Sequence, residues 1–182
     1  MVDVPEALET RRFHLRPPMS GDEPGWLEAI EETWDDLHKW IPWARSRPTL
    51  ESLAERGRGV RDNFAARTDL AYHIRDKASG RIAGGIGLHR LDWDVPRFEI
   101  GYWVRKSFHR QGVAAEVTAH MRDVCFNTLG ARRVEIRCSH NNLASQRVAL
   151  AAGFPLEATL RNHMREYYSG ELCDTLVYAI VR

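Results

Sequence analysis

Cysteine is scarce in this chain of 182 residues, and the patterns that would give it a structural or catalytic role are missing. Its three cysteines, Cys125, Cys138 and Cys173, are widely spaced, form no CxxC pair and have no histidine at zinc-ligand spacing. Such an odd, scattered set predicts reduced cysteines in a cytoplasmic protein. We therefore expect neither a disulfide framework nor a metal site.

An excess of charge and a long apolar run are missing as well. Lys and Arg number 26 against 25 Asp and Glu, so the basic surplus typical of nonspecific nucleic-acid binding is absent. No stretch approaches the roughly 20 apolar residues that cross a bilayer, and the opening MVDVPEALETRR has no apolar signal region. We expect no direct nucleic-acid partner, no membrane partner and, with 43% hydrophobic residues, a single domain spanning residues 1–182.

The apolar residues follow two periodicities, one typical of helices and one typical of strands. Apolar spacings of three and four with capping residues predict helices, the first of them capped by Ser20. The predicted helices span residues 22–33, 50–66, 111–129 and 142–152. Strict alternation predicts strands in residues 11–16, DLAYHIRD, RIAGGIGLHRL, RFEIGYWV, RRVEIRC, and residues 156–167 and 172–181. Within them, Gly84, Gly85 and Gly87 suggest a bulge or a close backbone approach.

The stretch KSFHRQGVAAE, residues 106–116, lies between a predicted strand and a predicted helix. Unpaired N–H groups at a helix start favour an anion, and Gly112 would let one approach the backbone without a side chain in the way. Positive charge is added by Arg105, Lys106, His109 and Arg110. Neither GxxxxGK[ST] nor GxGxxG is present. Taken alone, the stretch is explained about as well by an ordinary solvated helix entry.

The order of motifs around this stretch resembles the GNAT superfamily of N-acetyltransferases and, within it, the RimJ/RimL-like branch that acetylates protein N-termini. The matching segments are EIGYWV, the cationic turn, a long helix, VEIRC, NLAS and AGF, and the resemblance runs from RRFHLRP to the final strand. The family's pyrophosphate loop, [Q/R]-x-x-G-x-[G/A], falls on residues 109–114, with His109 in place of the usual Gln or Arg.

The resemblance implies both a fold and a cofactor. The fold is α/β (α+β), with a mostly antiparallel sheet of about seven strands, helices on both faces and a V-shaped splay between the fourth and fifth strands. Acetyl-CoA would lie in the splay, with its pantetheine arm beside Trp103, Val104 and Arg105, and Asn142 would hydrogen-bond the arm. The pyrophosphate would be held by the loop residues His109, Arg110, Gln111, Gly112, Val113, Ala114 and Ala115.

Two glutamates compete for the role of the general base. Glu99 alternates with the apolar face of its strand, so it points to the other side beside aromatic residues, where a raised pKa would suit a base. Its alternative interpretation is a surface strand glutamate paired with Arg97 or Arg105. Glu166, ahead of the hairpin turn, is the second candidate, because the resemblance to RimL-like enzymes implies a basic glutamate near that hairpin.

The candidate proton donor for the departing thiolate lies in NLAS, residues 142–145, which resembles the family's NxxS element. No Ser-His-Asp or Cys-His arrangement is evident, which fits direct attack by the amine in a ternary complex. Many relatives use a tyrosine seven residues after the motif asparagine, and that position here is Ala149, so this donor is missing. The resemblance makes Ser145 the candidate acid instead. A helix cap for Asn142 and an ordinary helix serine are the structural alternatives.

The acceptor is the least determined part of the prediction. Trp40 and Trp43 are candidates for lining its pocket, and buried packing is the competing explanation. The leading acceptor is the N-terminal α-amine of a protein or peptide, followed by a small polycation such as a polyamine or an aminoglycoside, which an acidic pocket would favour. A non-catalytic acyl-CoA-binding module is the alternative outside the enzymes. Dimers are common in the family that the chain resembles, which leaves a homodimer open.

Overall fold

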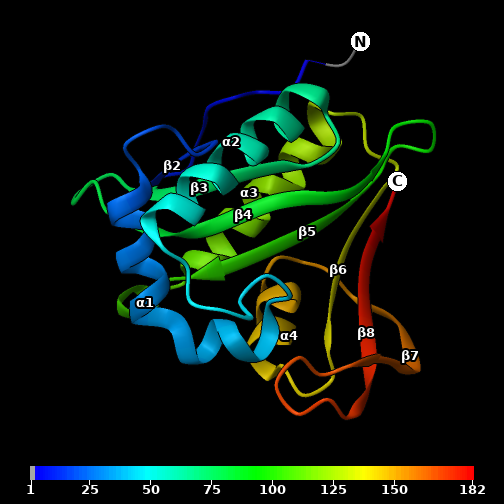
Figure 1. The fold of residues 1–182 in the computed structure, drawn as a ribbon. Coiled ribbons are helices and arrows are strands. Elements are labelled where there is room, and N and C mark those ends of the chain that lie inside the picture. The colour runs from blue at the N-terminus through cyan, green and yellow to red at the C-terminus, as the bar shows by residue number, and fades with distance from the viewer. Residues whose placement is uncertain (1–2) are drawn as a thin grey trace.

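The structure, a computed structural model, describes residues 3–182 and arranges them around one twisted sheet (Figure 1). In this part of the chain eight strands follow the order β1-β2-β3-β4-β5-β6-β8-β7, and each neighbouring pair is antiparallel except β5 with β6. The strands are β1 (Leu8–Glu9), β2 (Phe13–Arg16), β3 (Leu70–Asp76), β4 (Ile82–Asp92), β5 (Arg97–Val104), β6 (Arg133–Ser139), β7 (Leu156–Arg165) and β8 (Leu172–Val181). The strand beyond the predicted set is β1, whose two residues are too few to show alternation.

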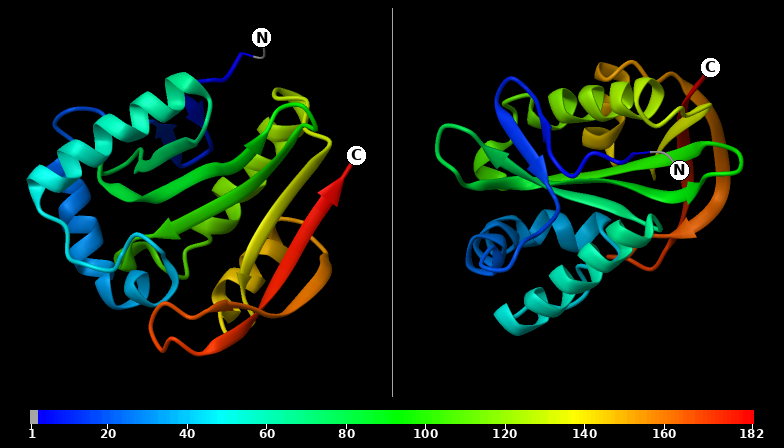
Figure 2. Two further views of the ribbon diagram at one scale, coloured as in Figure 1. Left: turned by 45° about the vertical axis from the view of Figure 1, so that its right-hand side comes forward. Right: turned by 90° about the horizontal axis from the view of Figure 1, so that it is seen from above.

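Helices cover both faces of this sheet, as predicted. The first two lie on one face and the last two on the other (Figure 2, right). The helices are α1 (Glu23–Trp40), α2 (Leu50–Ala66), the 3₁₀ helix η1 (Lys106–Phe108), α3 (Val113–Asn127) and α4 (Leu143–Ala151). Within residues 3–182, no helix has the length and apolar character needed to cross a membrane.

The start of α1 differs from the prediction. Its N-cap is Asp22 and not Ser20, and the helix continues past the predicted end to Trp40. Asp22 is nearly buried and accepts two hydrogen bonds from the guanidinium of Arg16 and one from that of Arg75 on β3, so these ion pairs fix where the chain enters the helix. The helix runs on because no residue before Pro42 breaks it.

The main core lies between the sheet and α3, and it buries the apolar side of β5. Phe98 and Ile100 are buried there with Val117 and Met121 of α3. Because strand residues alternate between faces, Glu99 lies on the opposite face, which α1 and α2 cover. The alternation read from RFEIGYWV is therefore confirmed.

The predicted splay is present between β5 and β6. The two strands pair only at their beginnings, where Arg97–Glu99 runs parallel to Arg133–Glu135. Beyond those residues the strands diverge, and α4 lies behind the gap (Figure 1). In chain order these are the strands that the sequence counted as fourth and fifth.

The glycines of β4 mark a bulge and a close approach, as expected. The β3–β4 register shifts between Ile74 and Arg75, opposite Gly84, whose φ is 153°. A Cβ on Gly84 would lie 2.2 Å from the backbone oxygen of Trp103, and one on Gly85 would lie 2.6 Å from the indole nitrogen of the same residue. Only glycine lets β4 and β5 approach this closely.

Candidate active site

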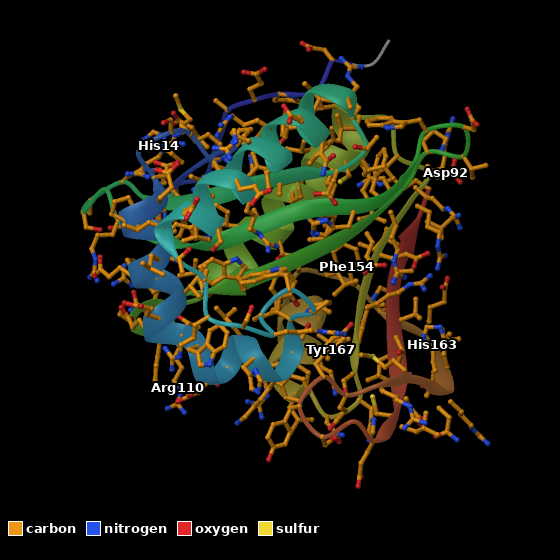
Figure 3. All side chains as sticks on the ribbon, in the orientation of Figure 1. His14, Asp92, Arg110, Phe154, His163 and Tyr167 are labelled. Carbon is orange, nitrogen blue, oxygen red and sulfur yellow. The ribbon has the colours of Figure 1, made fainter. Side chains whose placement is uncertain are left out.

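A cavity of about 820 Å³ opens at the splay, on the sheet face that α1 and α2 cover. It brings together the candidates Trp40, Trp43, Glu99, Ser145 and Glu166, which lie far apart in the sequence. Trp103 and Asn142 line it too. Figure 3 shows Arg110 of the cationic loop at the edge of the molecule away from His163, which lines the cavity.

Glu99 lies in the cavity wall beside two arginines. Its Oε2 is 3.3 Å from Nη1 of Arg90 and 3.5 Å from Nε of Arg137, yet this buried oxygen accepts no hydrogen bond within the part of the chain that the structure describes. Burial raises the pKa of the Glu99 carboxyl above its ordinary value, outweighing the two guanidiniums, which lower it. An enclosed carboxylate with an open acceptor oxygen suits a general base.

Glu166 has a different environment. One of its oxygens accepts a hydrogen bond from Nδ2 of Asn141 at 2.5 Å, and the other accepts one from the hydroxyl of Ser169 at 2.9 Å. These hydrogen bonds hold the pKa of the Glu166 carboxyl below its ordinary value. Its occupied oxygens make it the weaker candidate of the two for a base.

Ser145 faces the splay from the first turn of α4. Asn142 caps this helix, because its Oδ1 accepts the Ser145 N–H at 3.1 Å. The Ser145 hydroxyl lies 3.0 Å from the hydroxyl of Tyr102 on β5. Burial raises the pKa of Tyr102, so this hydroxyl stays neutral. Ala149 is fully buried in the core, so a side chain there would not face the cavity.

In the cationic loop, the groups placed to bind an anion are backbone N–H groups and not side chains. Gly112 is the N-cap of α3 with a φ of 73°, and no side chain caps the first N–H groups of the helix. Nε2 of His109 lies 2.8 Å from the carbonyl oxygen of Val104. Arg12 braces the loop by donating to the carbonyl oxygen of Gln111 at 2.9 Å. The free N–H groups at this helix start suit an anion.

The end of β5 likewise presents its backbone to the splay. The guanidinium of Arg105 is buried and donates to Glu28 and Glu32, both at 2.5 Å, so this side chain faces α1. The Arg105 N–H donates to the Ala83 carbonyl at 2.8 Å, which joins this edge of β5 to β4. Because hydrogen bonding alternates along an antiparallel strand, Val104 directs its N–H toward the splay, while its carbonyl oxygen there is contacted by His109.

A histidine–aspartate pair on the same wall was missed by the sequence analysis. Nδ1 of His89 lies 2.6 Å from Oδ2 of Asp69, and His89 is the cross-strand partner of Glu99. The imidazole lies over Gly87 and Gly101, where added Cβ atoms would approach it to 3.0 and 2.8 Å. The only sequence signal was two glycines on neighbouring strands, and their pairing needs the strand register.

Comparison with known proteins decides the family. A model of the acetyltransferase (GNAT) domain matches residues 12–155. The chain belongs to the GNAT acetyltransferase family. Among its relatives, the uncharacterized N-acetyltransferase YoaA of Bacillus subtilis is 33% identical over 134 residues, which cover 74% of this chain and 69% of that protein. The ribosomal-protein-serine acetyltransferase of Escherichia coli is 30% identical over 98 residues, 54% of each chain.

Solved structures of other acetyltransferases share the fold of this acetyltransferase. RimL, the ribosomal L7/L12 α-N-protein acetyltransferase in complex with coenzyme A, superposes with a TM-score of 0.86 at 21% identity, covering 97% of this chain and 98% of that one. Mycobacterium smegmatis RimJ, in complex with CoA-disulfide, superposes with a TM-score of 0.84 at 23% identity, covering 96% and 86%.

The residues of this acetyltransferase fit the coenzyme that these relatives bind. The splay frees the backbone edge of β5, and the start of α3 presents uncapped N–H groups. An added Cβ on Gly112 would find only Arg12 Nη2 within 4 Å, at 3.8 Å, so the backbone there is open to a phosphate. A cationic side chain, Arg12, stands beside that opening.

Proposed function

We propose that this acetyltransferase acetylates the N-terminal α-amine of a protein or peptide, with acetyl-CoA as the donor. The observation that carries the proposal is the single cavity at the splay, which is lined by both a base candidate and an acid candidate, Glu99 and Ser145. The two side chains come from opposite sides of the gap between β5 and β6. An amine bound between them would meet a proton acceptor and a proton donor together.

In this proposal each residue has a separate task. Acetyl-CoA supplies an activated thioester carbonyl. Glu99 accepts a proton from the acceptor ammonium, directly or through a water, because burial raises the pKa of its carboxyl and leaves Oε2 without a hydrogen bond. Ser145 donates a proton where the thiolate leaves, and Tyr102 orients its hydroxyl from 3.0 Å. The backbone of Val104 and the start of α3 hold the pantetheine arm and the pyrophosphate.

The charge of the cavity supports a peptide over a polyamine or an aminoglycoside. A polycation requires carboxylates free to pair with it, but Asp69 is paired with His89 and Glu99 lies between Arg90 and Arg137. Two of the similar proteins, the ribosomal-protein-serine acetyltransferase of Escherichia coli and RimL, are named for ribosomal-protein acceptors. The guanidiniums of Arg90 and Arg137 beside Glu99 also favour the neutral form of an amine bound there, which is the form that attacks.

The test is direct. The protein is incubated with acetyl-CoA and a panel of peptides, polyamines and aminoglycosides, and the products are identified by mass spectrometry. Acetylated peptide α-amines are expected. Exclusive acetylation of a polyamine or an aminoglycoside would replace the proposed acceptor. Coenzyme binding without any product, in a panel with varied N-terminal residues, would instead support a non-catalytic acyl-CoA-binding module.

A further inference from the structure

Arg56 of α2 is a cation in the acceptor cavity, and the carboxylate that acts on its charge, Asp69 on the same cavity wall, does so from beyond ion-pair distance. Arg56 lines the cavity, and its Cζ lies 4.5 Å from the centroid of the Trp43 ring. It makes no ion pair or hydrogen bond with any residue between 3 and 182, and it is half-buried. An arginine stays protonated in such a place, and because Asp69 is itself paired with His89, the N–H donors of Arg56 are left for a ligand.

The position of Arg56 is fixed through a stack of aromatic rings. Trp43 meets Trp103 of β5 edge to face, with ring centroids 6.3 Å apart and planes at 72°. Trp103 lies on the same face of β5 as Glu99, four residues further along the strand. A guanidinium stacked on one face keeps its N–H donors free along the edge, in the geometry that suits a carboxylate.

Two further cations accompany Arg56, whose cavity is also lined by the carboxylates of Asp69, Glu99 and Glu166. Lys39 and Arg45 also lack a carboxylate partner among the described residues, whereas the whole chain carries a formal charge of only +1. Lys39 lines the same cavity as Arg56.

A second cavity, of about 610 Å³, continues from the first. The two share the lining residues Met164, Glu166 and Tyr167, and the second is also lined by Arg45. Arg45 lies over the Tyr167 ring at 5.9 Å, and Figure 3 shows Tyr167 on the loop beside the segment that follows α1. A chain whose N-terminus entered the first cavity would leave through the second, along the cations.

We propose that Arg56 binds the carboxylate of an acidic side chain at the second or third position of the acceptor peptide. The enzyme would thereby select α-amines that are followed closely by Asp or Glu. This inference rests on the proposed function, since it names the class of peptide that the same cavity takes. Lys39 and Arg45 would add longer-range attraction for further acidic residues, weakened by salt.

The experiment compares matched peptides as acceptors at saturating acetyl-CoA. Each set has the same N-terminal residue and carries Asp, Asn or Lys at position two or three. We expect kcat/KM for the best Asp peptide to exceed that of its Asn isostere by about ten- to a hundredfold, the range of a hydrogen bond to a charged group. Free aspartate and glutamate test the other source of a carboxylate, and efficient acetylation of either would overturn the choice of a peptide side chain.

Three variants assign the preference to Arg56. Arg56→Met keeps much of the stem and should bring the Asp-to-Asn ratio close to one, whereas Arg56→Lys should keep part of it. Arg56→Glu should favour the Lys peptide. The matched control is Arg47→Met, because Arg47 lies over Trp34 at 5.1 Å in the same kind of stack but lines neither cavity. Its ratio should equal that of the wild type.

The outcomes separate this inference from the proposed function. If no peptide of any charge is acetylated, the proposed function fails. If the Asn and Asp peptides are acetylated equally well by the wild type, only the acidic preference fails. A preference that survives both Arg56→Met and Arg56→Glu would assign it to another residue and overturn the role of Arg56. Thermal melting and acetyl-CoA binding of each variant establish that the folded enzyme is being compared.

Discussion

The hydroxyl of Tyr102 lies 3.0 Å from Oγ of Ser145 and 3.1 Å from the carbonyl oxygen of the same residue. This contact joins β5 to the first turn of α4 across the splay. Ser145→Ala should therefore lower turnover by roughly 10², as loss of a general acid does, and leave acetyl-CoA affinity nearly unchanged. The Asn142 cap survives the change, because it uses the backbone N–H. Single-turnover kinetics measure the chemical step.

Tyr102→Phe is the companion variant for the same contact. It keeps the ring and removes only the hydroxyl, so a smaller loss than that of Ser145→Ala is expected. A Ser145→Ala enzyme with full turnover would show that water protonates the thiolate. A tyrosine at position 149 should not rescue the variant, because Ala149 is fully buried and a larger side chain would overpack the core.

Glu99→Gln should lower turnover far more than it weakens acetyl-CoA binding. The base must be ionised to act. Because the pKa of Glu99 is raised, the acidic limb of the rate profile should lie at higher pH than an ordinary carboxyl would give. Activity is thus lost as pH falls through that limb, and Glu99→Gln should remove the limb. The loss should shrink at high pH, where the acceptor amine is already neutral. Profiles of kcat/KM against pH measure both effects.

Glu166→Gln is the matched control for that profile. The carboxylate of Glu166 is held by Asn141 and Ser169, with its pKa below the ordinary value, so its acidic limb would lie at lower pH. We expect turnover close to that of the wild type. If turnover collapses in Glu166→Gln and survives in Glu99→Gln, the base has been assigned to the wrong glutamate.

Gly112→Asp should abolish stabilisation by acetyl-CoA. Ligand at about 100 times its dissociation constant should add roughly 2.7 kcal/mol to the wild type. The variant places a negative charge at the start of α3, where the pyrophosphate is expected. Because Gly112 has a φ of 73°, any side chain there is strained, and Gly130→Asp supplies the control with a φ of 70° and open space around it. Thermal melting with and without ligand should show a shift only in Gly130→Asp and the wild type.

Two glycines, the buried Gly84 and the exposed Gly59, should respond to substitution by alanine with opposite signs of the change in stability. Gly84→Ala should destabilise the protein by about 1–3 kcal/mol, since its Cβ would meet the Trp103 backbone oxygen at 2.2 Å. Gly59 lies within α2, and a Cβ added there would find nothing within 4 Å among the described residues. Gly59→Ala should therefore stabilise the folded protein by about 0.5–1 kcal/mol. Urea denaturation measures both. A stable Gly84→Ala would mean that β4 and β5 do not approach as described.

Much of the local structure was predictable, because its causes lie within a few residues along the chain. The alternation in RFEIGYWV placed Glu99 on the face opposite the core, and the bounds of α2 followed from its own sequence. Gly112 at the start of α3 was likewise predicted from a strand, a turn and a glycine. The sequence was misleading at Ser20, where the cap is set by Asp22 and its pairing with Arg16.

The sequence by itself thus determined the order of the elements and the glycine that starts α3, and it supplied the candidate residues for the site. The tertiary structure alone decided which carboxylate is buried, that Tyr102 meets Ser145, and that Arg56 lies over Trp43. The physical reason is that a pKa, a hydrogen bond between strands and the stacking of a cation on an aromatic ring depend on distances between segments far apart in the chain. Periodicity determines on which face of a strand or helix a residue lies. Only the packing of the sheet and the helices determines which residues contact it there.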